Sequence, residues 1–131
     1  KVIAMDILDM SPLPGVEFIQ GDFREEHAVL ELRQHLGEHQ PDLVISDMSP
    51  NISGIVVSDQ ARSMYLAELA LAFSMEQLNY GGNFLVKVFQ GRDSEQFLRD
   101  MRAGFKSVLI RKPKASRDRS NELYLLGLGK K

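Results

Sequence analysis

The chain has 131 residues, 44% of them hydrophobic, and it contains no cysteine. This composition predicts one globular domain, residues 1–131, and excludes disulfide bonds and thiolate zinc sites. No apolar run approaches the roughly 18 residues that a membrane span requires. The first residues, KVIAMD, show no secretory signal, so we expect a cytoplasmic protein without a membrane segment.

The formal net charge of −2 conceals two halves of opposite sign. Residues 1–60 hold 3 Lys or Arg against 11 Asp or Glu, and residues 61–131 hold 13 against 7. The densest basic segment, KSVLIRKPKASRDR, is a candidate phosphate-binding patch, with an ordinary solvated loop as the alternative. Its central cations are Lys112, Lys114, Arg117 and Arg119.

Six runs rich in apolar and β-branched residues predict strands. In chain order they are residues 1–6, 15–22, 42–47, 82–89, 107–113 and 122–129. Helical spacing of apolar residues predicts three helices between them. These cover residues 25–37, 59–82 and 93–105.

Glycines and polar residues mark where the helices begin and end. Gly37 is the expected C-cap of the first helix, and Gly81 with Gly82 is expected to stop the second. Asp93 and Gln96 have the spacing of a capping box at the start of the third. The apolar stripe of the third helix consists of Phe97, Met101 and Phe105.

The order of elements predicts an α/β fold with a mostly parallel sheet. No helix is predicted between the last two strands, and a parallel return normally needs a crossover helix. We therefore expect one reversed, antiparallel strand at the end of the chain.

Three aspartates follow or end predicted strands: Asp6, Asp22 and Asp47. In open α/β sheets, ligands bind beyond the carboxyl ends of the strands. A carboxylate there can accept hydrogen bonds from two ribose hydroxyls at once. Asp6 and Asp22 therefore suggest a nucleoside-like ligand, although Asp6 alone is equally typical of a turn.

Lys87 interrupts FLVKVF, a strand whose other residues are apolar. A lysine in such a strand needs a partner for its ammonium or a lowered pKa. The alternative is a lysine that snorkels from an edge strand. Glu122 opens the last strand, where a plain strand-start carboxylate is the alternative to a role beside Lys87 and Asp47.

The spacing of His35 and His39, four residues apart, is that of a zinc-binding pair. No third ligand is evident at a strand end. We therefore expect no metal site.

The motifs SDMSPN, GGNFLVKVFQG and RKPKASRDRSNELYLLGLG together resemble the FtsJ family, also called RrmJ or RlmE, of ribosomal RNA ribose 2′-O-methyltransferases. The resemblance implies a Rossmann-like fold that uses S-adenosylmethionine. It further implies methylation of the 2′-hydroxyl of a uridine in the A-loop of 23S rRNA, on the large ribosomal subunit.

The resemblance also implies roles for individual residues. The catalytic set of the family is Lys-Asp-Lys-Glu, and its last three members fall on Asp47, Lys87 and Glu122. The cofactor-binding carboxylates fall on Asp6, Asp22 and Asp47. With an RNA substrate, the basic segment becomes a candidate RNA-binding region.

The family's first strand, its glycine-rich loop and its first catalytic lysine have no counterpart here. We therefore expect an N-terminally incomplete methyltransferase domain that binds cofactor poorly. The strands that carry Asp6 and Asp47 would lose a shared neighbour and have unpaired edges.

Other functions remain compatible with parts of the sequence. The acceptor could belong to transfer RNA or a messenger cap. An amino-directed methyltransferase would usually place an aromatic residue where Asn51 stands. A nicotinamide dehydrogenase could use Asp6 for ribose, but no G-x-G-x-x-G is present. A non-catalytic RNA-binding module would have no need of Lys87.

Overall fold

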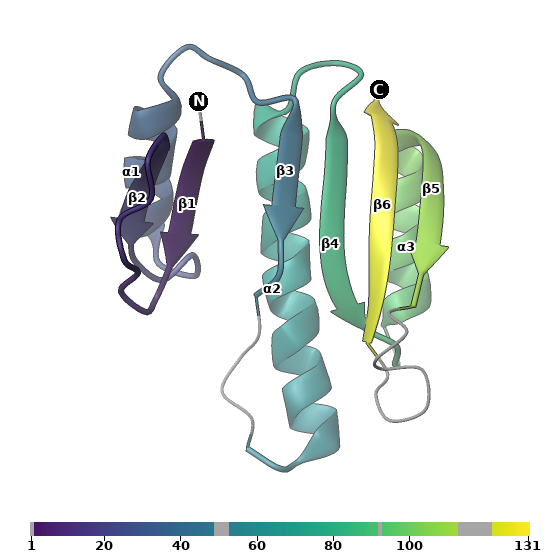
Figure 1. Cartoon of the computed structure of the whole chain (residues 1–131). Coiled ribbons are helices and arrows are strands. Elements are labelled where there is room, and N and C mark those ends of the chain that lie inside the picture. Colours follow the sequence, from purple (N-terminus) through teal and green to yellow (C-terminus); the bar gives the residue numbers. More distant parts are fainter. Residues whose placement is uncertain (1, 49–52, 92, 113–121) are drawn as a thin grey trace. The chain divides into compact units, whose positions relative to one another are not determined.

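The computed structural model describes residues 2–48, 53–91, 93–112 and 122–131. By their internal contacts these residues form two compact units, one within residues 1–40 and one within residues 41–131. Figure 1 shows the elements of both units in sequence colours.

The first unit consists of two parallel strands and a helix. Strand β1 (Val2–Asp6) pairs in parallel with β2 (Val16–Gln20), in a register that places Asp6 opposite Gln20. Helix α1 (Glu26–Leu36) follows, and all three elements lie within the predicted ranges. Gly37 caps α1 with a φ of 59°, the left-handed region that favours glycine, so its predicted role is confirmed.

The core of this first unit is small. Among its described residues, only Ile19 and Ala28 are buried apolar side chains. A Cβ added to Gly21 would lie 3.2 Å from the Cβ of Ala28, so the absence of a side chain at Gly21 lets the end of β2 approach α1 closely.

The second unit is built on a four-stranded sheet in the order β3-β4-β6-β5. Its strands are β3 (Leu43–Ser46), β4 (Asn83–Phe89), β5 (Phe105–Arg111) and β6 (Glu122–Lys130). Strands β3 and β4 are parallel, whereas β6 is antiparallel to both β4 and β5. The prediction of one reversed strand is confirmed, and that strand lies inside the sheet.

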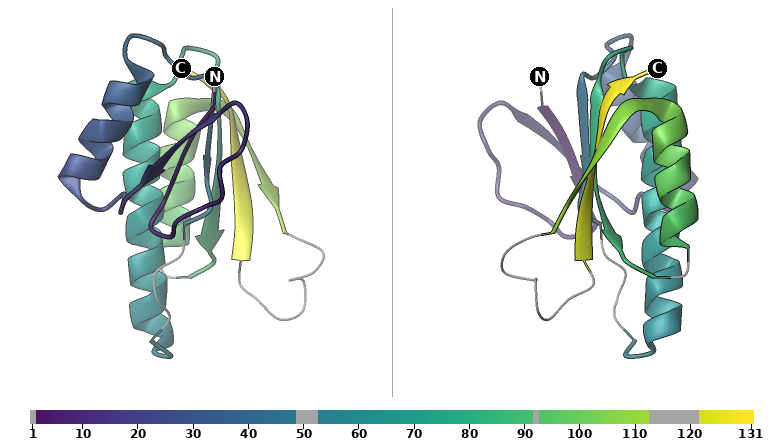
Figure 2. Two further views of the ribbon diagram at one scale, coloured as in Figure 1. Left: turned by 60° about the vertical axis from the view of Figure 1, so that its left-hand side comes forward. Right: turned by 90° about the vertical axis from the view of Figure 1, so that its right-hand side faces the viewer.

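Helices α2 (Val56–Gln77) and α3 (Ser94–Gly104) cover one face of this sheet (Figure 2). Alternate residues of β4 point into the resulting core, because side chains of a strand alternate between the two faces. The fully buried large side chains of the core include Phe84, Val86, Val88, Phe97, Met101 and Phe105. No helix in the described ranges combines the length and apolar character needed to cross a membrane.

The predicted ends of the second helix are wrong. Helix α2 begins at Val56, three residues earlier than predicted, so Asp59 lies in its first turn and is not its first residue. It ends at Gln77, since Leu78 is already extended with a φ of −64° and a ψ of 142°. Gly81, with a φ of 82°, instead forms part of the turn that leads into β4.

The predicted capping box of the third helix is also wrong. Asp93 is the N-cap residue of α3, but its side chain makes no capping hydrogen bond. The side chain of Gln96 bonds instead with Asp100 and Arg99, one turn further along the helix surface. These pairs at i, i+4 and i, i+3 replace the reciprocal cap.

Strands β1 and β3 are among the strands that have an edge without a described partner. Within the described residues, β1 pairs only with β2, and β3 pairs only with β4. On β3, the side chains of Leu43 and Ile45 are 53% and 62% exposed. Both strands therefore have an unpaired edge among the described residues, whereas the loss of a shared neighbour and the single domain stay predictions.

Candidate active site

Asp47 and Lys87 form an ion pair at the carboxyl ends of two parallel strands. Figure 1 shows β3 and β4 side by side. Their register places Ser46 opposite Val86, so the next residues, Asp47 and Lys87, are neighbours. Lys87 Nζ lies 2.9 Å from Asp47 Oδ1. The expected partner for the lysine is thus present.

The surroundings of the two groups differ. The side chain of Lys87 is only 11% exposed, whereas that of Asp47 is 59% exposed. Strand β4 lies between β3 and β6, so the alternative of a lysine snorkelling from an edge strand is wrong. A nearly buried ammonium on a central strand requires compensation by polar partners, and Asp47 supplies one of them.

Glu122 lies near the same end of the sheet. It is the first residue of β6 and pairs with Phe89, while Lys87 pairs with Tyr124. Glu122 is therefore a diagonal neighbour of Lys87, and such neighbours lie about 7–8 Å apart, within reach of long side chains. Three adjacent strands thus bring the three predicted catalytic residues to one end of the sheet.

Asp6 ends β1, and Asp22 follows β2 by two residues, so both lie at the carboxyl end of the small sheet in the first unit. The backbone N–H of Gly21 donates a 2.9 Å hydrogen bond to the carbonyl of Asp6, which ties the ends of β1 and β2 together. Asp6 is exposed, and its Oδ1 accepts the N–H of Leu8 at 3.0 Å. Asp6 therefore forms the local turn that was the alternative interpretation, and its carboxylate still has acceptor capacity.

Asp22 has a partner that the sequence analysis did not identify. Arg24 Nη2 donates to Asp22 Oδ2 at 2.6 Å, and Arg24 Nε donates to Asp22 Oδ1 at 3.0 Å. These side-chain hydrogen bonds are the main reason why the pKa of Asp22 is lowered from 3.8. The i, i+2 spacing in GDFR was the available signal for this pair.

The structure thus shows two groups of candidate residues, each within its own unit. Asp6 and Asp22 belong to the first unit, and Asp47, Lys87 and Glu122 belong to the second. Each group lies at the carboxyl ends of parallel strands, the edge where open α/β sheets bind ligands.

Of the four candidate RNA-binding residues, the structure describes one. Lys112 is exposed just after β5. Lys114, Arg117 and Arg119 lie outside the described residues, as does Asn51.

Two histidines of the first unit, His27 and His35, lie close to carboxylates. His35 Nδ1 lies 3.1 Å from Glu17 Oε2, and His27 Nε2 lies 3.2 Å from Glu25 Oε2. In the described part of the chain, no three His, Asp or Glu side chains are grouped as metal ligands would be.

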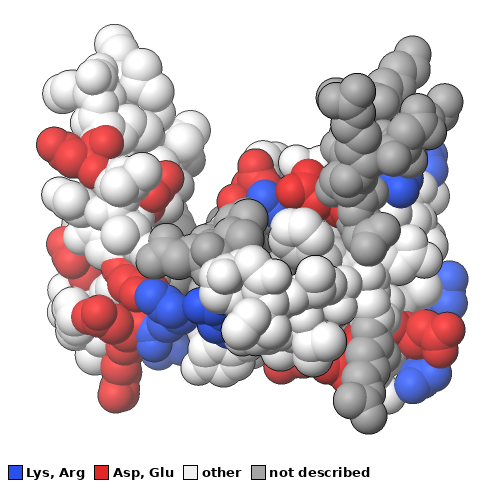
Figure 3. Space-filling model, turned by 90° about the horizontal axis from the view of Figure 1, so that it is seen from below, with Lys and Arg blue, Asp and Glu red and all other residues white. Residues whose placement is uncertain are grey.

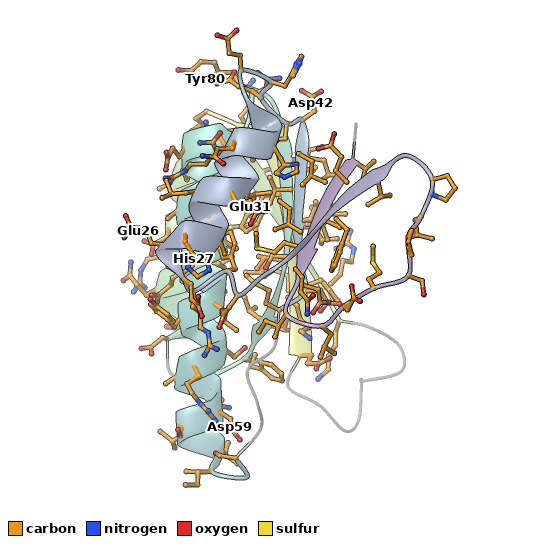
Figure 4. All side chains as sticks on the ribbon, turned by 90° about the vertical axis from the view of Figure 1, so that its left-hand side faces the viewer. Glu26, His27, Glu31, Asp42, Asp59 and Tyr80 are labelled. Atoms are coloured by element: carbon orange, nitrogen blue, oxygen red, sulfur yellow. The ribbon has the colours of Figure 1, made fainter. Side chains whose placement is uncertain are left out.

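Asp59 organises the segment that leads into α2, which the sequence analysis also missed. Its carboxylate accepts the backbone N–H of Ser53 at 3.0 Å, the hydroxyl of Ser53 at 2.7 Å and the N–H of Gly54 at 3.2 Å. Arg62 pairs with this carboxylate one turn along the helix. Figure 4 labels Asp59 near the start of α2. These bonds, first those from Ser53, lower the pKa of Asp59 to about 2.

The fold and these residues define a class of protein. In each unit the candidate residues lie at the carboxyl ends of parallel strands, where enzymes with open α/β sheets bind their ligands. Solved methyltransferases share this fold. A Plasmodium falciparum protein described as a ribosomal RNA methyltransferase matches 99% of this chain and 72% of its own, with a TM-score of 0.86 and 26% identity. A Streptococcus mutans methyltransferase solved with SAH matches with a TM-score of 0.55 at 14% identity, covering 98% of this chain and 71% of its own.

The family follows from the sequence comparison. The model of the FtsJ-like methyltransferase family matches residues 1–130, and the chain belongs to that family. A relative from Nitrosomonas europaea, named ribosomal RNA large subunit methyltransferase E, is 66% identical over 99% of this chain. A relative of the same name from Chromobacterium violaceum is 60% identical over the whole chain. The chain spans 63% and 64% of the lengths of these two relatives.

Proposed function

We propose that this protein methylates a ribose 2′-hydroxyl in the RNA of the large ribosomal subunit, with S-adenosylmethionine as the methyl donor. The names of the relatives support the choice of large-subunit RNA. The 2′-oxygen of a uridine in the 23S A-loop is the finer proposal, and it rests on the resemblance to the family. The observation that carries the proposal is the Lys87–Asp47 ion pair at the end of β4.

Lys87 acts on the acceptor hydroxyl in this proposal. A ribose hydroxyl is a weak nucleophile, so the site must orient its oxygen and provide a route for its proton. The 2′-oxygen bonds to the methyl carbon as the carbon–sulfur bond breaks, and the hydroxyl proton leaves to a base. Lys87 would orient the oxygen as an ammonium or accept the proton as an amine, and Asp47 with Glu122 would control which form is present.

The carboxylates of the first unit suit the nucleoside part of the cofactor. When bound, S-adenosylmethionine supplies an electrophilic methyl group on a sulfonium. Asp6 is exposed at a strand end and has acceptor capacity for ribose hydroxyls. Asp22 is held by Arg24, so a ligand that bonds to Asp22 would share or displace that guanidinium. Asp47, more than half exposed, completes the proposed cofactor-binding set.

The substrate can be tested by comparing three classes of RNA as methyl acceptors. The full-length protein is incubated with methyl-labelled S-adenosylmethionine and one of three acceptors: large subunits that lack the modification, unmodified transfer RNA, or capped messenger RNA. We expect label in the large-subunit RNA alone. Label only in transfer RNA or in the cap would contradict the ribosomal substrate, and no label in any acceptor would contradict the proposed activity.

A further inference from the structure

A pocket of about 220 Å³ lies between the first turns of α2 and the segment that follows β4. Its apolar wall consists of Val57, Ala61, Met64 and Phe89. Val56 and Val57 are 66% and 73% exposed, so the apolar surface continues outward at the start of α2. Figure 3 looks onto this end of the molecule and shows uncharged surface in the foreground.

Two polar side chains, Gln60 and Asp93, complete the pocket. Gln60 Nε2 donates a 3.5 Å hydrogen bond to the carbonyl of Gln90. A Cβ on Gly91 would stand 2.9 Å from Gln60 Oε1, so the glycine leaves room for the amide. Because the side chain of Asp93 makes no capping hydrogen bond to α3, its carboxylate is not used by the helix that it begins.

The size and charge of the pocket favour a nucleobase. The pocket is smaller than the roughly 300–1,000 Å³ typical of sites for drug-sized ligands, which favours one planar ring over a whole nucleotide. Among the described lining residues, the ionisable group is the carboxylate of Asp93, so a phosphate would meet like charge. An aromatic ring and apolar walls suit the face of a base, and an amide with a carboxylate suits its polar edge.

The position of the pocket connects it with the candidate active site. Phe89 lies two residues beyond Lys87 on β4, which in a strand is a separation of about 7 Å. We propose that the pocket holds an unstacked base of the RNA substrate next to the nucleotide whose ribose meets Lys87. This inference rests on the proposed RNA substrate. The bound base would fix the RNA while the hydroxyl is oriented.

A substitution that fills the pocket tests the inference. Ala61 is exposed at the pocket, so Ala61→Trp should occupy the space without disturbing the core. Ala72→Trp is the matched control, because Ala72 is also exposed on α2, about 16 Å further along the helix. Asp93→Ala is a second variant, since the exposed Asp93 has no packing role that its removal would disturb.

Three quantities are measured for each variant: the Kd for protein-free large-subunit RNA by filter binding, the kinetics of methyl transfer to unmodified subunits, and the Kd for S-adenosylmethionine. Ala61→Trp should raise both the Kd and the KM about tenfold, the effect of losing one stacked base. Asp93→Ala should raise them about threefold, since one polar contact is lost. Cofactor affinity should not change in either variant, and Ala72→Trp should match the wild type throughout.

The remaining outcomes test RNA binding by the pocket separately from methyl transfer. A wild-type Kd for Ala61→Trp overturns the inference, even if methyl transfer is observed. A KM that rises on subunits while the Kd for protein-free RNA stays constant also overturns it, and indicates that the pocket holds a ribosomal protein segment. A third outcome is that the wild-type protein labels no RNA and Ala61→Trp binds RNA more weakly than the wild type. That result would support the pocket and contradict the proposed function.

Discussion

Lys87 is the residue on which the proposed chemistry depends most. Lys87→Ala should lower kcat for methyl transfer at least about 100-fold, because a positioned acid–base group typically contributes 10²–10⁴. Cofactor affinity should stay at the wild-type value, since the proposed cofactor contacts are carboxylates. Single-turnover transfer and equilibrium cofactor binding measure the two effects.

Lys131→Ala is the matched control for this prediction. Lys131 is exposed and follows β6 at the end of the sheet opposite to that of Glu122. Transfer by Lys131→Ala should equal that of the wild type. Near-normal kcat in Lys87→Ala would remove Lys87 from the mechanism.

Asp6 should affect the cofactor and leave the chemical step unchanged. Asp6→Ala removes a charged acceptor for ribose hydroxyls, and a hydrogen bond to a charged group is worth about 1.5–3 kcal/mol. We expect the Kd for S-adenosylmethionine to rise at least tenfold, with kcat at saturating cofactor close to normal. Isothermal titration calorimetry gives the Kd.

Asp9→Ala tests whether any loss of charge in this loop has the same effect. Asp9 is exposed and its Oδ1 accepts the neighbouring N–H of Met10. The Kd of Asp9→Ala should not change. An equal loss of affinity in both variants would show that Asp6 acts through the general charge of the loop.

At the level of elements, the start of α2 should be sensitive to pH through Asp59. Its pKa is lowered from 3.8 to about 2 in the folded protein, so its ionised form stabilises the fold. This stabilisation is complete above about pH 4 and is lost as the pH falls towards 2. Asp59→Asn should therefore lower the Tm at pH 6, and the difference from wild type should shrink between pH 4 and pH 2.

Thermal unfolding followed by circular dichroism across this pH range measures the effect. Asp42→Asn is a suitable control, because Asp42 is an exposed aspartate of the same unit with one side-chain partner, Asn79. A difference between Asp59→Asn and wild type that stays constant down to pH 2 would contradict the role given to the Asp59 carboxylate.

The packing of β6 against β5 depends on a missing side chain. A Cβ on Gly127 would lie 2.7 Å from the ring of Phe105, which is 1% exposed. Gly127→Ala should therefore destabilise the protein by about 1–3 kcal/mol, the usual cost of overpacking. Denaturant unfolding gives the free energy.

A second substitution distinguishes this clash from a general loss of strand geometry. Phe105→Leu makes room, so the double variant should be less destabilised than the sum of the two single variants. Strict additivity would show that the cost of Gly127→Ala does not come from the ring of Phe105.

The elements show what the sequence could predict and why. All six strands and all three helices were located, because apolar periodicity reflects the faces that each element buries. The ends of α2 were missed, since they depend on hydrogen bonds between residues that are distant in sequence or outside the helix. The predicted range began at Asp59, whereas in the structure the Asp59 carboxylate accepts hydrogen bonds from Ser53 and Gly54, which precede the helix.

The candidate site also combines features that could be predicted from the sequence with features that could not. The apolar strand around Lys87 predicted that its ammonium needs a partner, and the resemblance to the family placed Asp47 in the same catalytic set. The ion pair between the two residues is a finding of the structure. The Asp22–Arg24 pair could not be predicted, because the conformation of the loop after β2 determines which partner each of the two side chains reaches. The pocket beside Phe89 could not be predicted either, since its walls come from α2 and from the segment after β4.

At the scale of the whole molecule, the two units should differ in stability. Nearly all buried apolar side chains of the described chain belong to the second unit, whereas the first has a two-stranded sheet and one helix. A sheet of two strands is marginal in water, and exchange protection follows the stability of each region. Amides of β1 and β2 should exchange with solvent faster than those of β4 and β6.

Hydrogen exchange followed by mass spectrometry measures this difference. Saturating S-adenosylmethionine should slow exchange in β1 and β2 if Asp6 and Asp22 bind the cofactor, because a ligand stabilises the state that binds it. Equal protection of the two units without ligand would contradict the assignment of the core to residues 41–131.

The position of the transferred methyl group tests the central claim most directly. Large-subunit RNA labelled by the wild-type protein is hydrolysed with alkali, and the products are separated by size. Label in an alkali-resistant dinucleotide is the expected result, because a methylated 2′-oxygen cannot attack the neighbouring phosphate. Label in mononucleotides would place the methyl group on a base and contradict a mechanism in which Lys87 acts on a ribose hydroxyl.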